Sequence, residues 1–295
     1  MATPRALELI LDFQPNPVHV GIYAAIADGA FERVGIEPRV RIPGDSSDAP
    51  KLLQAGRVDL AVLDIHDLAI ARERGVDLVG VGAIIQRPLA AVIANRDRIR
   101  SPADLFGATV GVTGLPSDDA VLEAVLEAGG GSGPPPETPT IGFKSVSALA
   151  AGRVDAATAF WNAEGVALEG LGVATREFRV DEFGAPSYPE LVLVATRGTL
   201  EREPELIDGA IAALSEGYST AISDPDRALE AMLSSLPEAD PDAFAAQMEA
   251  LVAADAFSPP LRLDPEVLEE WARWDRRFGI VEEAPVIERA FDLDR

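Results

Sequence analysis

The chain has 295 residues, 47% of them hydrophobic, and a formal net charge of −24. This length is enough for a sizeable core and fits two domains of ordinary size. The excess of carboxylates argues against a nucleic-acid partner or an anionic membrane surface, because a phosphate backbone needs clustered Lys and Arg. Cys is absent and His occurs only at positions 19 and 66. Disulfides, Cys-based zinc sites and iron–sulfur clusters are thereby excluded, and we expect no metal site and no cofactor.

The N-terminal residues do not have the composition of a secretory signal. The residues before Leu7 hold a single Arg, and the apolar run that follows contains Glu8 and Asp12. No apolar run is long enough to span a bilayer. The sequence leaves two locations open: an extracytoplasmic one, in the periplasm or at the cell surface, if a signal has been trimmed, and a cytoplasmic one.

The first half of the chain predicts strand, helix, strand, helix, strand. Its apolar and periodic segments are Leu7 to Phe13, His19 to Val34, Pro38 to Ile42, Leu52 to Gln54 and Leu60 to Leu63. Val76 to Ile84 predicts a further strand. In the second half, the corresponding segments are Thr109 to Leu115, Ser117 to Ala128, Thr138 to Phe143, Ala148 to Ala150 and Ala156 to Phe160. The alternation of strands with helices is typical of parallel sheets covered by helices on both faces.

One short motif, Ala-Gly-Arg-Val-Asp, occurs in both halves, at residues 55–59 and 151–155. Each copy follows a short helical segment and precedes an apolar run, and Gly is the usual helix terminator at such a junction. We therefore predict an α/β protein of two lobes with doubly wound sheets and C-terminal helices. Lobe I comprises residues 1–90 and 195–295, lobe II residues 91–194, and a ligand cleft lies between them. One larger doubly wound sheet is the alternative.

Two apolar segments, Leu89 to Asn95 and Leu191 to Thr196, are interpreted as the crossings between lobes. Three Asp-Pro pairs, at 224–225, 240–241 and 264–265, predict the starts of successive C-terminal helices, because Asp is a good N-cap and Pro suits the first turn. Trp271 and Trp274 lie three residues apart on the last of these helices, a spacing that favours core packing.

Open α/β sheets bind ligands at the carboxyl ends of their strands, so residues that follow strands are the candidates for the site. In the first half these candidates are Phe13, Asn16, His19, Ser46, His66 and Gln86. Some have a purely local interpretation: the loop at 43–50 offers Ser47 or Asp48 as an N-cap, and Asp64 is predicted to cap the helix that carries His66.

The candidates of the second half are Gly114, Ser117, Asp118, Trp161, Asn162, Glu164, Tyr188 and Glu190. The loop from Gly114 to Asp119 joins a strand to a helix, but two acidic residues in the first turn disfavour a phosphate there. The cluster of Trp161, Asn162 and Glu164 directly after a strand favours function over packing.

These side chains suit a flat ring that bears amino groups. Aromatic faces stack on such a ring for about 1–3 kcal/mol each, and a carboxylate that accepts from an exocyclic amine or a ring N–H adds about 1.5–3 kcal/mol. Few Arg residues are among the candidates, so a sulfonate or nitrate is a poorer match. The sequence contains no nucleophile elbow, Walker loop or dinucleotide fingerprint, and we predict no catalytic residues.

Together the segments Leu11 to Asn16, Pro43 to Asp45, the repeated Ala-Gly-Arg-Val-Asp, Gly114 to Asp118, Trp161 to Gly165 and Tyr188 to Leu191 resemble the NMT1/THI5-like group. The resemblance spans nearly the whole chain. It implies a type II periplasmic-binding-protein fold and a monomeric solute-binding subunit that works with an ABC permease and ATPase. The ligand it implies is a pyrimidine precursor of thiamine, such as a formylaminopyrimidine or hydroxymethylpyrimidine. It places Asn16, Trp161, Glu164, Tyr188 and Glu190 in contact with the ring.

The chain departs from the group's pattern at Phe13, where Trp is common, and at Pro17, where Asn is common. Phe stacks but donates no hydrogen bond. The same group includes riboflavin binders, and it resembles the hydroxymethylpyrimidine phosphate synthases, which use a pyridoxal phosphate Schiff base, a substrate His and a Cys-rich iron site. His66 falls near that His, but the only Lys residues are Lys51 and Lys144 and Cys is absent. We therefore expect a binding protein, not an enzyme.

Overall fold

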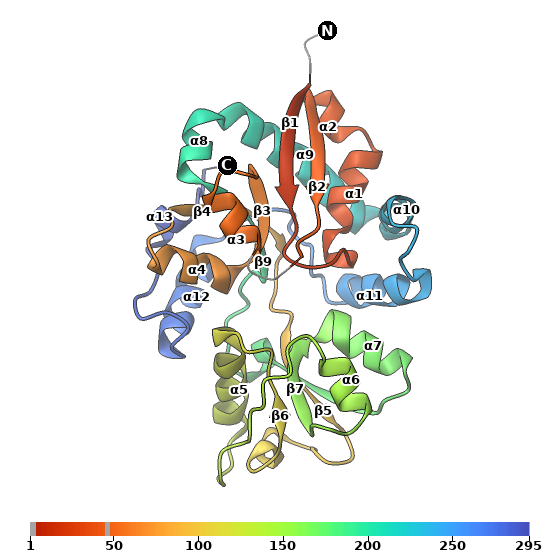
Figure 1. Ribbon diagram of the computed structural model, residues 1–295, viewed down its shortest axis with the longest axis vertical. Helices are drawn as coiled ribbons and strands as arrows, with labels where there is room; N and C mark the ends of the chain where they lie inside the picture. The colour runs from red at the N-terminus through yellow and green to blue at the C-terminus, as the bar shows by residue number, and fades with distance from the viewer. Residues whose placement is uncertain (1–3, 45–47, 295) are drawn as a thin grey trace. The chain divides into compact units, whose positions relative to one another are not determined.

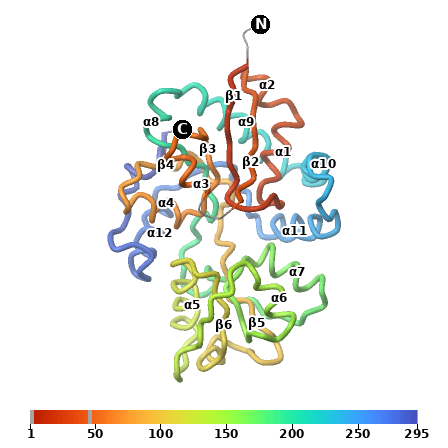
Figure 2. Tube along the Cα trace, viewed as in Figure 1, coloured from red at the N-terminus to blue at the C-terminus, as the bar shows by residue number. Residues whose placement is uncertain are grey.

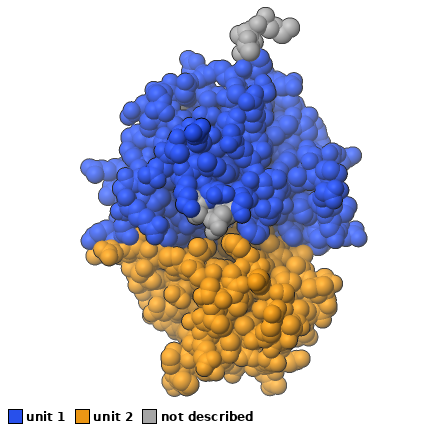
Figure 3. Space-filling model, in the orientation of Figure 1, with its two compact units in different colours: residues 1–86, 189–272, 283–295 blue, residues 87–188, 273–282 orange. Residues whose placement is uncertain are grey.

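The computed structural model describes residues 4–44 and 48–294. The chain divides into two compact units, coloured separately in Figure 3. The first unit comprises residues 1–86, 189–272 and 283–295, and the second comprises residues 87–188 and 273–282. Each unit has its own β-sheet, so the alternative of one larger sheet is wrong.

The sheet of the first unit has five strands in the order β2-β1-β3-β9-β4 (Figure 1). They are β1 (Arg5–Ile10), β2 (Ile36–Arg41), β3 (Leu60–Asp64), β4 (Leu78–Ile85) and β9 (Leu191–Thr196). Strand β1 pairs in parallel with β2 and β3, whereas β9 runs antiparallel to both β3 and β4. The expectation of a wholly parallel sheet is therefore wrong for β9. It returns from the second unit at the edge where β3 and β4 end, so it runs against them.

The sheet of the second unit has four strands in the order β6-β7-β5-β8. They are β5 (Ala90–Asn95), β6 (Val110–Gly111), β7 (Ala156–Phe160) and β8 (Thr175–Arg179). Strands β6 and β7 are parallel, but β5 is antiparallel to β7 and β8. The reason is the same as for β9: β5 carries the chain in from the other unit and has no crossover helix before it.

The strand predicted at Thr138 to Phe143 does not form. The segment makes only isolated bridges, from Glu137 to Thr109 and from Thr140 to Val112. Its neighbour β6 is two residues long, and Pro139 has no N–H to donate to a ladder. The segment therefore runs beside β6 without becoming a regular strand.

The burial of each strand explains its place in the sheet. Every residue of β4 is buried, as are four of the five residues of β3, which is the pattern of strands covered on both faces. The edge strand β2 alternates between less and more exposed residues, and its exposed face carries Glu37, Arg39 and Arg41. Charged side chains on an edge strand discourage pairing with a second chain.

Both copies of the repeated motif have the same structure, as the sequence predicts. The Gly at position two of each copy, Gly56 and Gly152, ends a helix in the left-handed conformation with φ of 62° and 64°. The final Asp then precedes a strand and accepts a backbone N–H from a neighbouring segment. Asp59 Oδ2 accepts from the N–H of Glu8 at 2.9 Å, and Asp155 Oδ2 accepts from the N–H of Thr109 at 3.0 Å. The motif therefore joins helix to strand in the same way in each unit.

Helices surround both sheets. Those of the first unit are α1 (Val20–Ala27), α2 (Ala30–Arg33), α3 (Asp48–Gln54), α4 (Ile65–Glu73), α8 (Arg197–Arg202), α9 (Pro204–Ser223), α10 (Pro225–Ser235), α11 (Pro241–Ala253), α12 (Pro265–Arg277, whose residues from Arg273 belong to the second unit) and α13 (Ile287–Ala290), with the 3₁₀ turn η1 (Pro17–His19). Those of the second are η2 (Pro102–Leu105), α5 (Pro116–Gly129), α6 (Ser145–Ala150), η3 (Trp161–Gly165), α7 (Val166–Gly170) and η4 (Val180–Phe183). Among the described residues, none of the helices has both the length and the apolar character needed to cross a bilayer.

The three Asp-Pro pairs start helices as predicted, because each Asp side chain accepts from a backbone N–H in the first turn of α10, α11 or α12. The long helix predicted from His19 to Val34 is instead divided into α1 and α2. The break falls at Gly29, whose φ of 68° no helix tolerates. Trp271 and Trp274 are buried, as their spacing predicts.

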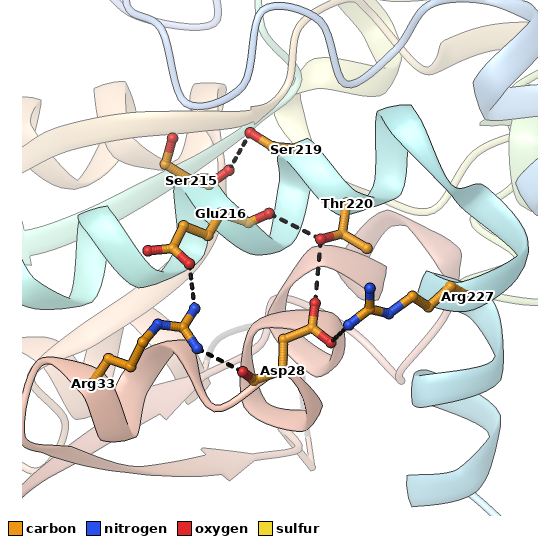
Figure 4. Close-up of polar contacts among 7 residues, drawn as sticks. All are labelled: Asp28, Arg33, Ser215, Glu216, Ser219, Thr220 and Arg227. Atoms are coloured by element: carbon orange, nitrogen blue, oxygen red, sulfur yellow. Dashed lines mark hydrogen bonds and ion pairs between the residues drawn. The ribbon is translucent and has the colours of Figure 1, made fainter.

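Helix α9 packs along α1 (Figure 2), and a polar network joins the turn after α1 to α9 and α10 (Figure 4). At its centre is Asp28, whose carboxylate pairs with Arg227 and accepts from Thr220 Oγ1 at 3.3 Å. Arg33 donates to the carbonyl of Asp28 at 2.7 Å and pairs with Glu216. These contacts hold one face of the first unit together, away from the strand ends that carry the candidate residues.

Candidate functional site

The topology brings four acidic side chains of the first unit to one edge of its sheet. Asp12 follows β1, and Asp64 is the last residue of β3, which runs parallel to β1. Glu190 directly precedes the antiparallel strand β9, so it reaches the same edge, where the N–H of Ile65 donates to the carbonyl of Glu190 at 3.0 Å. Asp67 lies in the first turn of α4. We call Asp12, Asp64, Asp67 and Glu190 the acidic edge.

His19 lies beside this edge and is fully buried at 0% exposure. Its Nε2 is 2.7 Å from Asp12 Oδ1, and its Nδ1 accepts from the backbone N–H of Asn16 at 3.3 Å. Asn16 caps the turn η1: its Oδ1 accepts from the N–H of Val18 at 3.2 Å, and its Nδ2 donates to the carbonyl of Gln14 at 3.1 Å. Both residues therefore organise the loop after β1, in which Phe13 is 38% exposed.

His66 forms the centre of a second group at this edge. One oxygen each of Asp64 and Glu190 and one ring nitrogen of His66 lie within 4.8 Å of one another. Asp64 also caps α4 as predicted, since its Oδ1 accepts from the N–H of His66 at 2.8 Å. Nε1 of Trp271 donates to Nδ1 of His66 at 3.3 Å. Both His66 and Glu190 are buried.

One member of the acidic edge, Asp67, has a disturbed ionisation. Burial, and then the charges of Asp64 and Asp12, raise the pKa of Asp67 to about 7, although His66 and Arg74 act in the opposite direction. Burial is the main reason that this carboxyl group titrates near neutrality, and the neighbouring negative charges add to it. An anion would therefore be repelled, and a group that offers N–H donors would be attracted.

Gln86 lies at the end of β4, where its side chain contacts backbone carbonyls of the protein. Its Nε2 is within hydrogen-bonding distance of three carbonyls, those of Ala83 at 3.1 Å, Pro259 at 2.7 Å and Arg262 at 3.0 Å. These contacts join the strand end to the loop before α12. A ligand contact for Gln86 stays a prediction, as does the one for Ser46, which lies outside the described residues.

In the second unit, the candidates Trp161, Asn162 and Glu164 lie on a π-helix, η3, that begins directly after β7. Single π-turns are rare and frequently occur at functional sites. Trp161 is 1% exposed, and its Nε1 donates to the carbonyl of Pro88 at 3.0 Å. Burial raises the pKa of Glu164, whose Oε2 accepts from the N–H of Phe160 at 3.1 Å. Asn162 is also buried, and among the described residues its Oδ1 has no hydrogen-bond partner.

Two arginines, which are not among the predicted site residues, flank Trp161. Cζ of Arg179 lies 4.1 Å from the centroid of the Trp161 ring, and Cζ of Arg87 lies 6.0 Å from it. Each arginine has a carboxylate neighbour: Arg179 pairs with Glu177 at 2.9 Å, and Arg87 pairs with Asp181 at 2.5 Å. The guanidinium of Arg179 occupies one face of the Trp161 indole, so a ligand ring cannot stack on that face.

The carboxylate of Asp118 organises the loop from Gly114 to Asp118 by accepting four hydrogen bonds. Asp118 Oδ2 accepts from the N–H of Gly114 at 2.8 Å, from the N–H of Leu115 at 3.0 Å and from Thr113 Oγ1 at 2.6 Å, and its Oδ1 accepts from Thr158 Oγ1 at 2.6 Å. The carboxylate takes the place that a phosphate would need at the start of α5. Gly114 has a φ of 99°, and Ser117 lies partly exposed in the first turn.

Tyr188 is fully buried, and its ring packs against Trp274 with 5.8 Å between centroids. The structure thus brings Asn16, His19, His66, Gln86 and Glu190 to the sheet edge of the first unit. It brings Gly114, Asp118, Trp161, Asn162 and Glu164 to the strand ends of the second. Tyr188 lies in the second unit, two residues before Glu190 of the first.

The family model described as NMT1/THI5 like matches residues 16–228 of the chain. The chain belongs to the NMT1/THI5-like family. One relative in this family is the formylaminopyrimidine-binding protein of Halalkalibacterium halodurans, which is 32% identical over 80% of this chain and 72% of its own length. Another relative is the 4-amino-5-hydroxymethyl-2-methylpyrimidine phosphate synthase of Legionella pneumophila, a hydroxymethylpyrimidine phosphate synthase. It is 25% identical over 78% of this chain and 73% of its own length.

Solved structures share the fold. The periplasmic aliphatic sulphonate binding protein of Escherichia coli superposes with a TM-score of 0.76 over 97% of each chain, at 19% identity. The predicted fold class, a two-sheet α/β fold of the periplasmic-binding-protein type, is thus confirmed. At this identity the likeness says nothing about the ligand.

Sequence reasoning missed several residues of these strand ends. Asp64 ends β3 and Asp12 lies two residues after β1, and these positions alone could have marked them as site candidates. Arg179 is the last residue of an edge strand, and Arg87 directly follows Gln86. No local pattern indicates that both arginines lie against Trp161. Trp271 lies outside the segment that the NMT1/THI5-like family model matches, and its bond to His66 spans 205 positions.

Proposed function

We propose that this chain is the solute-binding component of an ABC importer and that it captures a pyrimidine precursor of thiamine, of the formylaminopyrimidine or hydroxymethylpyrimidine type. The observation that carries the proposal is the buried Glu190 beside Asp64 and His66 on the acidic edge. An aminopyrimidine offers an exocyclic amine to such acceptors, and each charge-assisted bond contributes about 1.5–3 kcal/mol. The name of the Halalkalibacterium relative supports the same ligand class.

In this proposal, the two predicted lobes, residues 1–90 with 195–295 and residues 91–194, form a hinged binding protein that holds the ligand between them. The acidic edge binds the amino groups, and the strand ends around Trp161 contribute an aromatic surface. Ligand contacts to both lobes favour the closed state over the open one. The predicted contacts of Phe13, Asn16, Ser117, Tyr188 and the other candidates belong to this proposal, as do the monomeric state and an extracytoplasmic location.

The test is thermal unfolding of the purified protein with hydroxymethylpyrimidine, formylaminopyrimidine, riboflavin, taurine and nitrate. A ligand at one hundred times its Kd stabilises the native state by about 2.7 kcal/mol, so a true ligand raises Tm clearly. We expect the aminopyrimidines to do so and taurine and nitrate to have no effect. Glu190→Gln should remove the response, whereas Glu201→Gln, a change at an exposed carboxylate of the same unit, should keep it. A response to the anions alone would contradict the proposal.

The second candidate function is synthesis of hydroxymethylpyrimidine phosphate, the activity named for the Legionella relative. It is disfavoured because a Schiff base needs an amine. The only lysines, Lys51 on α3 and Lys144 at the start of α6, are both exposed and far in sequence from His66. Addition of pyridoxal phosphate separates the two: the visible absorbance of a Schiff base would favour the enzyme, and its absence would favour the binding protein. Riboflavin, if it alone raised Tm, would identify a flavin binder of the same family.

A further inference from the structure

Both histidines of the chain are held by the same kind of contact. Nδ1 of His19 faces the backbone N–H of Asn16 at 3.3 Å, and Nδ1 of His66 faces the indole N–H of Trp271 at 3.3 Å. A backbone N–H and an indole N–H can only donate. In each case Nδ1 must therefore carry a lone pair, and a neutral imidazole of this form carries its proton on Nε2.

The contact of His19 on its other side agrees with this tautomer. Its Nε2 lies 2.7 Å from Asp12 Oδ1, the position of an N–H that donates to a carboxylate. For His66, the neighbouring carboxylates are Asp64 and Glu190, each with an oxygen within 4.8 Å of a ring nitrogen. The histidines thus repeat one arrangement, a donor behind Nδ1 and carboxylates close to the ring.

A group of two carboxylates and one histidine also has the composition of a metal site. The direction of the Trp271 hydrogen bond distinguishes metal binding from hydrogen bonding to a ligand. A histidine that binds a metal through one nitrogen normally donates its other N–H to an acceptor behind it. Trp271 is a donor, so it opposes that form of the ring. Coordination through Nε2 would move the proton to Nδ1 and set two N–H groups against each other.

We propose that Trp271 is a positioning residue: it holds His66 in the Nε2–H tautomer, in which the ring presents an N–H while the carboxylates of Asp64 and Glu190 accept the N–H donors of an amino-substituted ring, and in which the group does not bind a metal ion. The proposal deepens the proposed function and rests on it for the identity of the ligand. Its structural part, the tautomer and the refusal of metal, holds without any ligand. Trp271 acts through His66 and needs no contact with the ligand itself.

Nitrogen-15 NMR of the imidazole rings tests the tautomer directly, because the chain has only two histidines. In the full-length protein without ligand, we expect both rings to show the Nε2–H pattern. Trp271→Phe removes the donor and should move the His66 signals toward the average of the two tautomers, while His19 stays unchanged as an internal control. Phe291 packs edge-on against Trp271 with 5.9 Å between centroids. Phe291→Leu is therefore the matched control for packing, and it should leave both histidines unchanged.

Two binding measurements complete the test. Trp271→Phe should weaken the affinity for hydroxymethylpyrimidine by about tenfold, the loss expected when one hydrogen bond of a buried group is no longer oriented. Phe291→Leu should change the affinity much less. Zn²⁺ added to the wild-type protein should produce no saturable binding and no change in the His66 signals.

The proposal is overturned if His66 of the wild type carries its proton on Nδ1, or if Zn²⁺ binds and shifts the His66 signals. These readouts use the wild-type protein, so they decide the matter even if Trp271→Phe fails to fold. If His66 shows the Nε2–H pattern but no aminopyrimidine binds, the role of Trp271 stands and the proposed ligand is wrong. The two failures are thereby distinguished.

Discussion

The strand ends of the two sheets carry different chemistry. In the first unit, Asp12, Asp64, Asp67 and Glu190 gather with both histidines, and burial with mutual repulsion raises the pKa of Asp67 to about 7. In the second unit, the charges are paired, Arg179 with Glu177 and Arg87 with Asp181, around the indole of Trp161. The first edge is therefore suited to accept hydrogen bonds from a ligand. The second surrounds a buried indole with charges that are already compensated.

The two units share one structural junction but differ in the residues beyond it. Both units keep the same junction, in which the Asp of Ala-Gly-Arg-Val-Asp accepts a backbone N–H from a neighbouring segment. The residues after the strands, which the junction does not constrain, are free to differ. The four predictions below test this division between shared framework and specialised edge.

The largest effect is expected at the framework of the second edge. Asp118→Ala removes the acceptor of four hydrogen bonds and leaves the amides of Gly114 and Leu115 and the hydroxyl of Thr158 without it. We expect a loss of about 3–5 kcal/mol in the free energy of unfolding. Asp119, the next residue, is exposed, and Asp119→Ala should change the free energy by less than about 0.5 kcal/mol. Chemical denaturation measures both, and equal effects would contradict the assigned role of Asp118.

The next effect belongs to the acidic edge and depends on pH. Because the pKa of Asp67 is raised to about 7 in the folded protein, its ionisation destabilises the fold as the pH rises from the unfolded value toward 7 and remains unfavourable above it. The full shift corresponds to about 4 kcal/mol at about 1.4 kcal/mol per pKa unit. Since the side chain keeps part of its surface in water, we expect about half of that.

Asp67→Asn, which resembles the protonated form, should therefore stabilise the protein by about 2 kcal/mol at pH 8, with the gain shrinking toward pH 4. Urea unfolding at several pH values measures it. A gain that does not change with pH would show that the acidic edge does not concentrate charge.

A smaller effect compares the two copies of the repeated motif. Asp59→Ala and Asp155→Ala each remove the acceptor for one backbone N–H, and Asp155 also pairs with Arg98 at 2.7 Å. We expect losses of about 1 and 1.5 kcal/mol at pH 7.

Although burial alone would raise the pKa of Asp155, the N–H of Thr109 and the guanidinium of Arg98 together lower it. The contribution of Asp155 is thus present above the ordinary Asp pKa, about 4, and is lost as the pH falls below it. Unfolding at pH 7 and pH 3 should show the loss from Asp155→Ala shrink at the lower pH. A larger loss for Asp59→Ala would mean that the copies are not equivalent.

The smallest effect concerns the cation on Trp161. Arg179→Gln removes the guanidinium from the indole face and should cost about 1 kcal/mol, in the range of a partly buried cation–π contact. Arg176, exposed on the same strand β8, supplies the control, and Arg176→Gln should be nearly neutral. If the two variants unfold alike, the contact of Arg179 with Trp161 is not a stabilising part of the second edge.

The local features of the fold could be predicted from the sequence. The strands other than β8, the Asp caps of α4 and of the three C-terminal helices, and both motif junctions depend on short-range signals such as apolar runs, Asp-Pro pairs and Gly after a helix. The break at Gly29 and the failure of Thr138 to Phe143 to form a strand were missed, although Gly29 and Pro139 are local signals for them.

The sequence by itself determined that two similar α/β halves exist and which short segments carry polar residues after strands. Only the tertiary structure decided how these residues combine. The antiparallel course of β9 brings Glu190 to Asp64 and His66, the last long helix brings Trp271 to His66, and β8 brings Arg179 to Trp161. The physical reason is that these contacts join residues far apart in the chain. Their position is set by strand direction and helix packing, which no local pattern of side chains encodes.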